Sequence, residues 1–395
     1  MKIKKNLASK YNPLYFLTSL GAGGISVSFF VYLQFMIPHK DTPIVTFNHI
    51  INYINEINII SIGIIGCLLS MLIFGIIHLY LLSWNIKEYN LFKKHVAHEQ
   101  LIKSNAGITL MAIPLTYAMT INVMFALGAS YIPNLWLIVE YLFPFAIIGF
   151  LMVGLYALNI FINYVLRLFN NPKYFSFEKN GNLSQMIAVF TFSMIAVGFS
   201  APVAMSENIV VNAIALFLSL MFLTISVVLF LFLIIMGIKS IMKHGITNGM
   251  EVSFWLPIPI LTLIGITVIR QWHGLSHNLS PLHSTIESPS LLVLTSVIVS
   301  SQLLIGYFGY KIMSNVEYYK SQFNIKNPSP SIGAIVCPMV AFTVFGSFFI
   351  HLGLVSNNII EKFSISYFII YTPFIIIQIV TLISFFKIYK NLLQK

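Results

Sequence analysis

Ten apolar stretches, together with the side of them on which the basic residues fall, constrain the fold of this chain more than any motif does. A helix needs about 20 residues to cross the hydrocarbon core of a bilayer, and each stretch has roughly that length or more. The stretches run roughly over residues 14–37, 57–83, 106–130, 134–160, 186–206, 209–238, 252–270, 289–313, 331–355 and 364–389. The sequence therefore predicts an all-α polytopic membrane protein with ten transmembrane helices.

The basic residues test this number of spans. Of the 22 Lys and Arg residues, all but Lys40, Arg270 and Lys362 fall in the N-terminal segment, the connections after even-numbered spans and the C-terminal segment. If one span were missed, every later connection would be predicted on the opposite side of the membrane, and this asymmetry would be lost. Because basic connections stay in the cytoplasm, we expect both termini to be cytoplasmic and the membrane to be a bacterial inner membrane.

Composition narrows the function classes. The chain is 58% hydrophobic and 8% charged, which is typical of a polytopic membrane protein. A net charge of +11 would suggest nucleic acid as a partner of a soluble chain, but here the cytoplasmic connections account for it, so we expect no nucleic-acid partner. The connections are too short for a soluble domain, so residues 1–395 are expected to form a single transmembrane domain. Two cysteines, Cys67 and Cys337, do not make a disulfide framework.

Helix-breaking and small residues gather in the odd-numbered spans, whereas the even-numbered spans are more uniformly apolar. The breakers and small residues that we take as candidates for the path are Gly24, Pro114, Pro202, Pro257 and Pro338. At membrane depth such residues need buried partners or water. The alternation predicts five helical hairpins in a ring, with the odd-numbered helices lining a central pore. Close packing of helices by small residues is the alternative interpretation.

Few ionisable residues lie inside the spans. Glu140 is expected to reach the interface or to accept a hydrogen bond, and His78 is expected to be a packed, hydrogen-bonded residue. Haem would need paired His ligands, ATP-driven pumping would need a nucleotide motif, and ion-coupled carriers usually have buried carboxylates; none of these stands out in the sequence. We therefore expect no cofactor. Hydroxyls, backbone N–H groups and broken helix ends could solvate an anion along such a path.

The connection that follows the seventh span combines Arg270 with several histidines. His273 and His277 are four residues apart and could share a helical face, as a pair of metal ligands would. A solvated loop and a vestibule that attracts anions are the other two interpretations. Because the spacing is common by chance, no metal site is predicted, and Arg270 and His273 are taken as candidates for the vestibule.

Cys337 opens the sequence Cys-Pro-Met in the ninth span. Pro338 removes one backbone donor and frees carbonyl groups one turn earlier, which would make this part of the span polar. A small thiol in an apolar core is the alternative. A reactive thiol at this depth would need a wet pore or a helix terminus to lower its pKa.

The whole pattern resembles the tellurite-resistance/dicarboxylate transporter family, which includes the plant guard-cell slow anion channels. The resemblance rests on residues 12–16 (NPLYF) followed by Gly21 and Gly24 in the first span, and on Pro338-Met339 in the ninth. It implies ten helices in five hairpins, odd-numbered helices around a pore, and a trimer. It also implies that Cys337 stands where the family carries a pore-plugging Phe.

A thiol is much smaller than a phenyl ring, so the plug is expected to be missing unless Phe342 or Phe345 replaces it. The chain is also similar to a related group of membrane proteins in which this position can be selenocysteine. The first hypothesis is an inner-membrane anion channel or uniporter, with a constriction near Cys337 and a small inorganic or organic anion as its partner. The alternative is a membrane thiol protein that uses Cys337 for redox or sulfur-compound chemistry or transport. A membrane subunit of a larger complex is the third class.

Overall fold

Long apolar helices dominate the chain. A computed structural model describes residues 3–55, 58–170, 181–276 and 288–394. Ten helices in this part are long and apolar enough to span a membrane, which confirms the predicted all-α polytopic membrane protein. The helices are α1 (Phe16–Met36), α3 (Ile59–Phe92), α5 (Ala112–Tyr131), α6 (Val139–Asn170), α7 (Met186–Met205), α8 (Ile209–His244), α9 (Pro257–Gly274), α10 (Ser288–Asn315), α11 (Val336–Phe348) and α12 (Ile365–Ile388).

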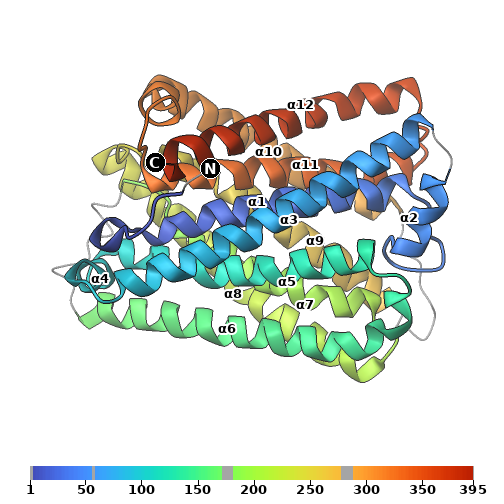
Figure 1. Cartoon of the computed structure of the whole chain (residues 1–395), viewed down its shortest axis with the longest axis horizontal. Helices are drawn as coiled ribbons and strands as arrows, with labels where there is room; N and C mark the ends of the chain where they lie inside the picture. Colours follow the sequence, from blue (N-terminus) through green and yellow to red (C-terminus); the bar gives the residue numbers. More distant parts are fainter. Residues whose placement is uncertain (1–2, 56–57, 171–180, 277–287, 395) are drawn as a thin grey trace.

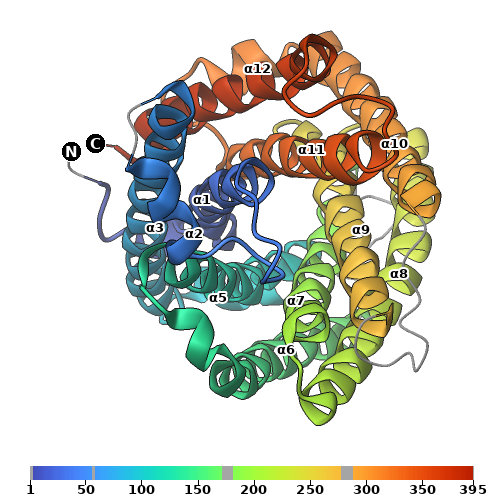
Figure 2. The same cartoon turned by 90° about the vertical axis from the view of Figure 1, so that its right-hand side faces the viewer.

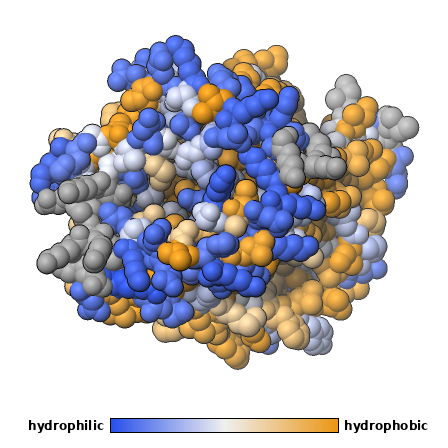
Figure 3. All heavy atoms as spheres, turned by 60° about the vertical axis from the view of Figure 1, so that its left-hand side comes forward, coloured by the Kyte–Doolittle hydropathy of each residue, from blue (hydrophilic) through white to orange (hydrophobic). Residues whose placement is uncertain are grey.

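The spanning helices lie alongside one another, and the two ends of the bundle differ (Figure 1). One end, here called the terminal face, carries both chain termini and the short helix α4 (Val96–Ile102). The other end, the distal face, carries α2 (Phe47–Ile54). Figure 3 turns the terminal face forward and shows hydrophilic atoms gathered on it, with apolar atoms along the adjoining flank. This distribution fits a protein whose flank lies in lipid.

The odd-numbered spans form an inner ring. Helices α1, α5, α7, α9 and α11 contact one another in this cyclic order, and α11 returns to contact α1. Figure 2 shows α3, α6, α8, α10 and α12 arranged outside them. Burial follows the same division: 61–94% of each inner span is buried, against 22–33% of each outer span. The predicted placement of odd-numbered helices inside and even-numbered helices outside is therefore found.

Short 3₁₀ segments precede most inner helices at the terminal face, and they explain where the prolines lie. The segments are Pro13–Tyr15, Asn105–Met111, Glu251–Trp255 and Pro330–Ile335. Pro257 is the first residue of α9, and Pro114 and Pro338 are the third residues of α5 and α11. Proline is tolerated in a first helical turn because its missing N–H would have no partner there. These three prolines therefore start helices and do not break them at mid-membrane.

Several outer helices are longer than the apolar stretches predict. Helix α3 continues to Phe92, α6 to Asn170 and α8 to His244. Hydropathy marks only the part of a helix that lies in hydrocarbon, and the polar turns beyond it keep their backbone hydrogen bonds. The ninth span ends in a π-helical turn, Phe349–Val355, that sequence reasoning does not foresee.

Gly265 allows α9 to approach α10 and α11 closely. A Cβ atom at this position would lie 2.5 Å from Phe345 Cε2 and 2.6 Å from Ile298 Cδ1. We expect Gly265→Ala to lower the melting temperature in detergent, because overpacking a buried contact costs about 1–3 kcal/mol. Gly66→Ala on α3 is the matched control, since a Cβ there meets nothing within 4 Å. Equal melting temperatures for the two variants would contradict the close approach.

Candidate functional site

Arg270 lies in the last turn of α9, on the side that faces the interior of the ring. Thr262 faces α11, because its hydroxyl donates to Ala341 O at 3.1 Å. Gly274 faces α7, where a Cβ atom would contact Val203. At about 100° per residue, Arg270 points between these two directions, roughly 80° from Thr262 and 40° from Gly274. Its side chain therefore extends toward the space between α7 and α11, about 6 Å from the distal end of α9.

The Arg270 guanidinium makes one hydrogen bond within the part of the chain that the structure describes. Its Nη1 donates to Val197 O at 3.2 Å. A guanidinium carries five N–H donors and one positive charge, yet among the residues that the structure describes no carboxylate lies within ion-pair distance of it. The side chain is partly accessible. A partly buried cation with spare donors and no counter-ion is suited to binding an anion.

Helix α7 presents carbonyl groups at the level of Arg270. Pro202 lies inside α7 and lacks an N–H, so the carbonyl of Gly198 loses its usual helical donor. Val197 O accepts from Ser200 Oγ at 2.8 Å as well as from Arg270. Pro202, one of the prolines taken from the sequence, thus lies within α7 one turn after the carbonyls of Val197 and Gly198.

Cys337 points toward the interior of the ring near the terminal face. Val336 packs on α1, since a Cβ atom at Gly21 would lie 3.1 Å from its side chain. Gly346 faces α12, where Phe374 occupies the space that a Cβ atom would take. Cys337 is about 100° from Val336 and about 180° from Gly346 around α11. Its side chain thus turns away from the outer helix, and it is only 7% exposed.

The side chains that α9 and α11 turn toward the centre of the ring near Cys337 and Arg270 are apolar and buried. Ala341, one turn after Cys337, is 7% exposed, and Leu263 and Ile266 of α9 are 8% exposed. By the same helical geometry these side chains turn inward. Between the thiol and the guanidinium, α9 and α11 thus present apolar side chains to the centre of the ring.

The two phenylalanines considered as substitutes for a plug lie elsewhere. The ring of Phe342 is 5.0 Å from that of Phe374 on the outer helix α12. Phe345 is fully buried against Gly265 of α9. Both rings are engaged in contacts between helices, so neither occupies the centre in this structure. Gly24 lies at the edge of the centre, where a Cβ atom would be 3.3 Å from Val340 Cγ1.

The hydroxyl groups of the inner helices do not line the centre as the sequence suggests. They donate to backbone carbonyls of the neighbouring inner helix: Thr116 to Phe16 O, Thr191 to Met111 O, and Thr262 to Ala341 O. Others join inner to outer helices, as Ser193 does with Ser226 at 2.5 Å. The reason is that a hydroxyl in hydrocarbon gains most from a fixed acceptor on the next helix. These groups hold the ring together.

Two ionisable residues that the sequence placed inside spans have structural partners. His78 of α3 contacts Ser19 O through Nδ1 at 2.8 Å and Thr120 Oγ1 through Nε2 at 2.9 Å. Glu140 accepts from Ser206 Oγ at 2.7 Å and from the backbone N–H of Glu207 at 2.8 Å. Both side chains are hydrogen-bonded to neighbouring segments, as the sequence predicts for these two residues.

Two carboxylates that the sequence does not single out are buried at the terminal face. Glu88 and Glu251 are each 4% exposed. Both lie at the polar ends of helices, where hydropathy alone predicts exposure. Their burial depends on chain segments that pack over them from elsewhere in the sequence, so no local signal reveals it.

The distal face carries His273, the second candidate for the vestibule, and also Lys362. His273 follows Arg270 by three residues in α9, whereas His277 lies outside the described residues. Lys362 donates to Met36 O at 3.4 Å, at the end of the inner helix α1, and burial lowers its pKa. In the described part of the chain no group of three or more His, Cys, Asp or Glu residues could hold a metal ion.

Comparisons with known proteins do not identify a family or a function for this arrangement of helices. No protein-family model, no curated protein and no solved structure matches the chain.

Proposed function

We propose that this chain is an anion channel or uniporter of a bacterial inner membrane, and that anions pass through the centre of the inner ring. The observation that carries the proposal is Arg270, a partly accessible cation on an inner helix that has no carboxylate partner among the described residues. A lone charge is costly to hold at membrane depth unless it serves a passing or bound ion.

The rest of the ring supports passage of an anion without trapping it. Arg270 attracts the ion near the distal face, and the spare N–H donors replace part of its water shell. Beyond the guanidinium, α9 and α11 present Leu263, Ile266 and Ala341 down to Cys337, so these two helices offer no second charged group to the ion. The side chains that α9 and α11 turn inward are buried, so we expect the ring to widen before an ion passes.

Orientation and assembly belong to the same proposal. The basic residues favour a cytoplasmic terminal face, so Arg270 would face the periplasm. The five-hairpin ring supports membership of the tellurite-resistance/dicarboxylate transporter family, and with it a trimer. Thiol chemistry at Cys337 is less well supported, since Cys67 lies on the outer helix α3 and packs in a different core cluster.

The test is anion efflux from liposomes that contain the purified protein. Liposomes are loaded with nitrate or chloride, a membrane potential is set with potassium and valinomycin, and efflux is compared with protein-free liposomes. We expect faster efflux that depends on the potential. Equal efflux with and without protein at every potential would overturn the proposal.

A further inference from the structure

The inner ring has one junction that no chain connection closes. Each hairpin is joined to the next by a loop, except that the first hairpin (α1 and α3) and the last (α11 and α12) meet as the two ends of the chain. Contacts across this junction are non-covalent, and they include the Phe74 and Phe385 rings, 5.4 Å apart. We call this the closing junction. If the ring widens, this junction is where it can do so without stretching a loop.

The N-terminal segment crosses the closing junction on the terminal face. Ile3 pairs with Gln394 in an antiparallel bridge, and the backbone N–H of Lys4 donates to Leu393 O at 2.9 Å. The Lys4 ammonium donates to Asn327 Oδ1 at 2.6 Å. Both termini lie next to each other in Figures 1 and 2, in agreement with these contacts. The segment is thus attached to the last hairpin.

The same segment is attached to the first hairpin through a buried carboxylate. Glu88 of α3 accepts from the backbone N–H of Asn6 at 3.0 Å and from that of Leu7 at 2.8 Å. Trp84, one turn earlier, donates from Nε1 to Lys4 O at 2.8 Å. A carboxylate that receives two N–H groups in a buried site makes charge-assisted hydrogen bonds, which are stronger than neutral ones.

The attachment holds a strained backbone. Asn6 has a φ of 58° and Ala8 a φ of 50°, in the left-handed region. Asn tolerates this region, but Ala is disfavoured there because its Cβ atom crowds the backbone. Strain of this kind persists only where surrounding contacts enforce it. The segment would therefore relax once its contacts with Glu88 are lost.

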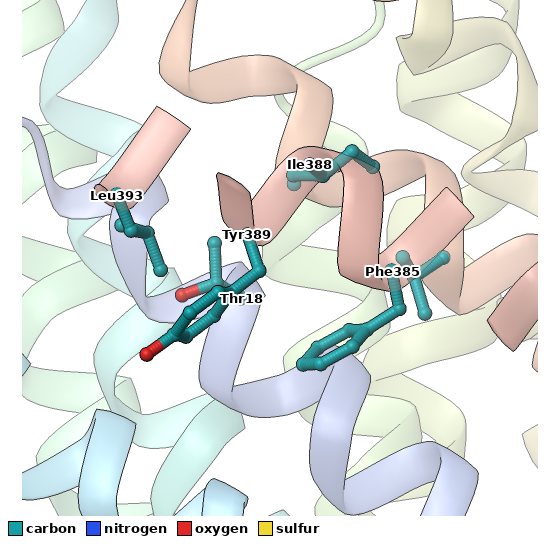
Figure 4. A pocket seen from close by; sticks show the side chains of 7 residues that line it. Thr18, Phe385, Ile388, Tyr389 and Leu393 are labelled. Atoms are coloured by element: carbon teal, nitrogen blue, oxygen red, sulfur yellow. The ribbon is translucent and has the colours of Figure 1, made fainter. Parts of the chain in front are cut away.

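Beneath this segment the closing junction is incompletely filled. A small cavity of about 10 Å³ lies between α1, α11 and α12, and Val336 is one of the residues that line it. Thr18 and Phe385 line it as well (Figure 4). Val336 precedes Cys337, whose side chain turns into the ring. A separation of α1 from α11 at this level would therefore expose the thiol to the terminal face.

We propose that residues 3–11 are a clasp that holds the ring closed at the closing junction, and that its release from Glu88 opens the centre beside Cys337 to the terminal face. The consequence for anion flux rests on the proposed function. The opening itself does not rest on the proposed function, because the rate at which Cys337 is labelled measures it directly.

The experiment measures how fast a small hydrophilic methanethiosulfonate reagent labels Cys337 in the full-length protein, in a Cys67→Ala background. Glu88→Gln keeps the size of the side chain but loses its charge and one acceptor. We expect it to label at least about tenfold faster, which corresponds to losing one or two net hydrogen bonds. Glu99→Gln is the matched control, since Glu99 is exposed and pairs with the exposed Lys103 at 3.8 Å.

Ala8→Gly tests the clasp in the opposite direction. Glycine adopts a positive φ without the crowding that Ala8 suffers, so this variant should strengthen the clasp and label several-fold more slowly than the Cys67→Ala parent. A misfolded protein would not label more slowly, so this variant decides the matter if Glu88→Gln fails to fold. The proposal is overturned if Glu88→Gln labels at the rate of Glu99→Gln, or if Ala8→Gly labels no more slowly than the parent.

Discussion

Replacing Arg270 with Gln should lower anion efflux from proteoliposomes by roughly 10- to 100-fold, since hydrogen bonds from a charged group are worth about 1.5–3 kcal/mol. The reason is the position of the guanidinium. It lies inside the ring, it donates to Val197 O, and no carboxylate in the described part of the chain neutralises it. Glutamine retains polarity but loses the charge that compensates the ion for its lost water.

The controls separate charge from packing. Arg270→Lys keeps the charge, so it should retain most of the efflux, although a point charge cannot reproduce the guanidinium fork. Arg167→Gln alters the only other Arg of the chain, at the end of the outer helix α6, and should leave efflux unchanged. If Arg270→Gln and Arg167→Gln gave the same rate, Arg270 would not serve the anion.

Much of the fold follows from the sequence because two simple physical signals agree. Hydropathy locates the ten spans, since an apolar helix satisfies its backbone hydrogen bonds internally and is therefore stable in hydrocarbon. Small residues and prolines then distinguish inner from outer helices, because inner helices pack on neighbours all round. Gly265 illustrates this, because the Phe345 ring occupies the space that a side chain at position 265 would need.

The direction of individual side chains could not be predicted in the same way. Phe342 and Phe345 follow Cys337 closely, yet at about 100° per residue a shift of one or two positions turns a side chain from the centre to a neighbouring helix. Which face of α11 looks inward depends on contacts with α1, α9 and α12, and these are remote in sequence. Arg270 could be selected by its charge, but its place inside the ring depends on how far α9 extends.

Buried polar groups at the terminal face were missed for a related reason. Glu88 lies in a stretch of charged residues that is typical of an exposed helix end. Only the N-terminal segment, about 80 residues earlier, covers it and supplies the two N–H groups that it accepts. Long-range cover of this kind leaves no periodicity that a sequence can reveal.

Replacing Cys337 with Phe should reduce efflux by at least about tenfold, because the path beside the thiol is closely packed and extra side-chain volume there would have to be displaced for each passing ion. Cys337 is 7% exposed and turns toward the interior of the ring, next to Ala341. A phenyl ring at this position would fill the space through which the ring must widen. Thermal melts of the same preparation show whether the larger side chain disturbs folding.

Cys337→Ala and Cys337→Ser decide between passage and thiol chemistry. If the thiol only borders the path, both variants should conduct at least as well as the parent, since neither adds volume. If the protein acts through thiol chemistry, both should lose activity while Cys67→Ala keeps it. A Cys337→Phe variant that conducts like the parent would remove Cys337 from the path, and the constriction would then have to be sought nearer Arg270, at Leu263 and Ile266.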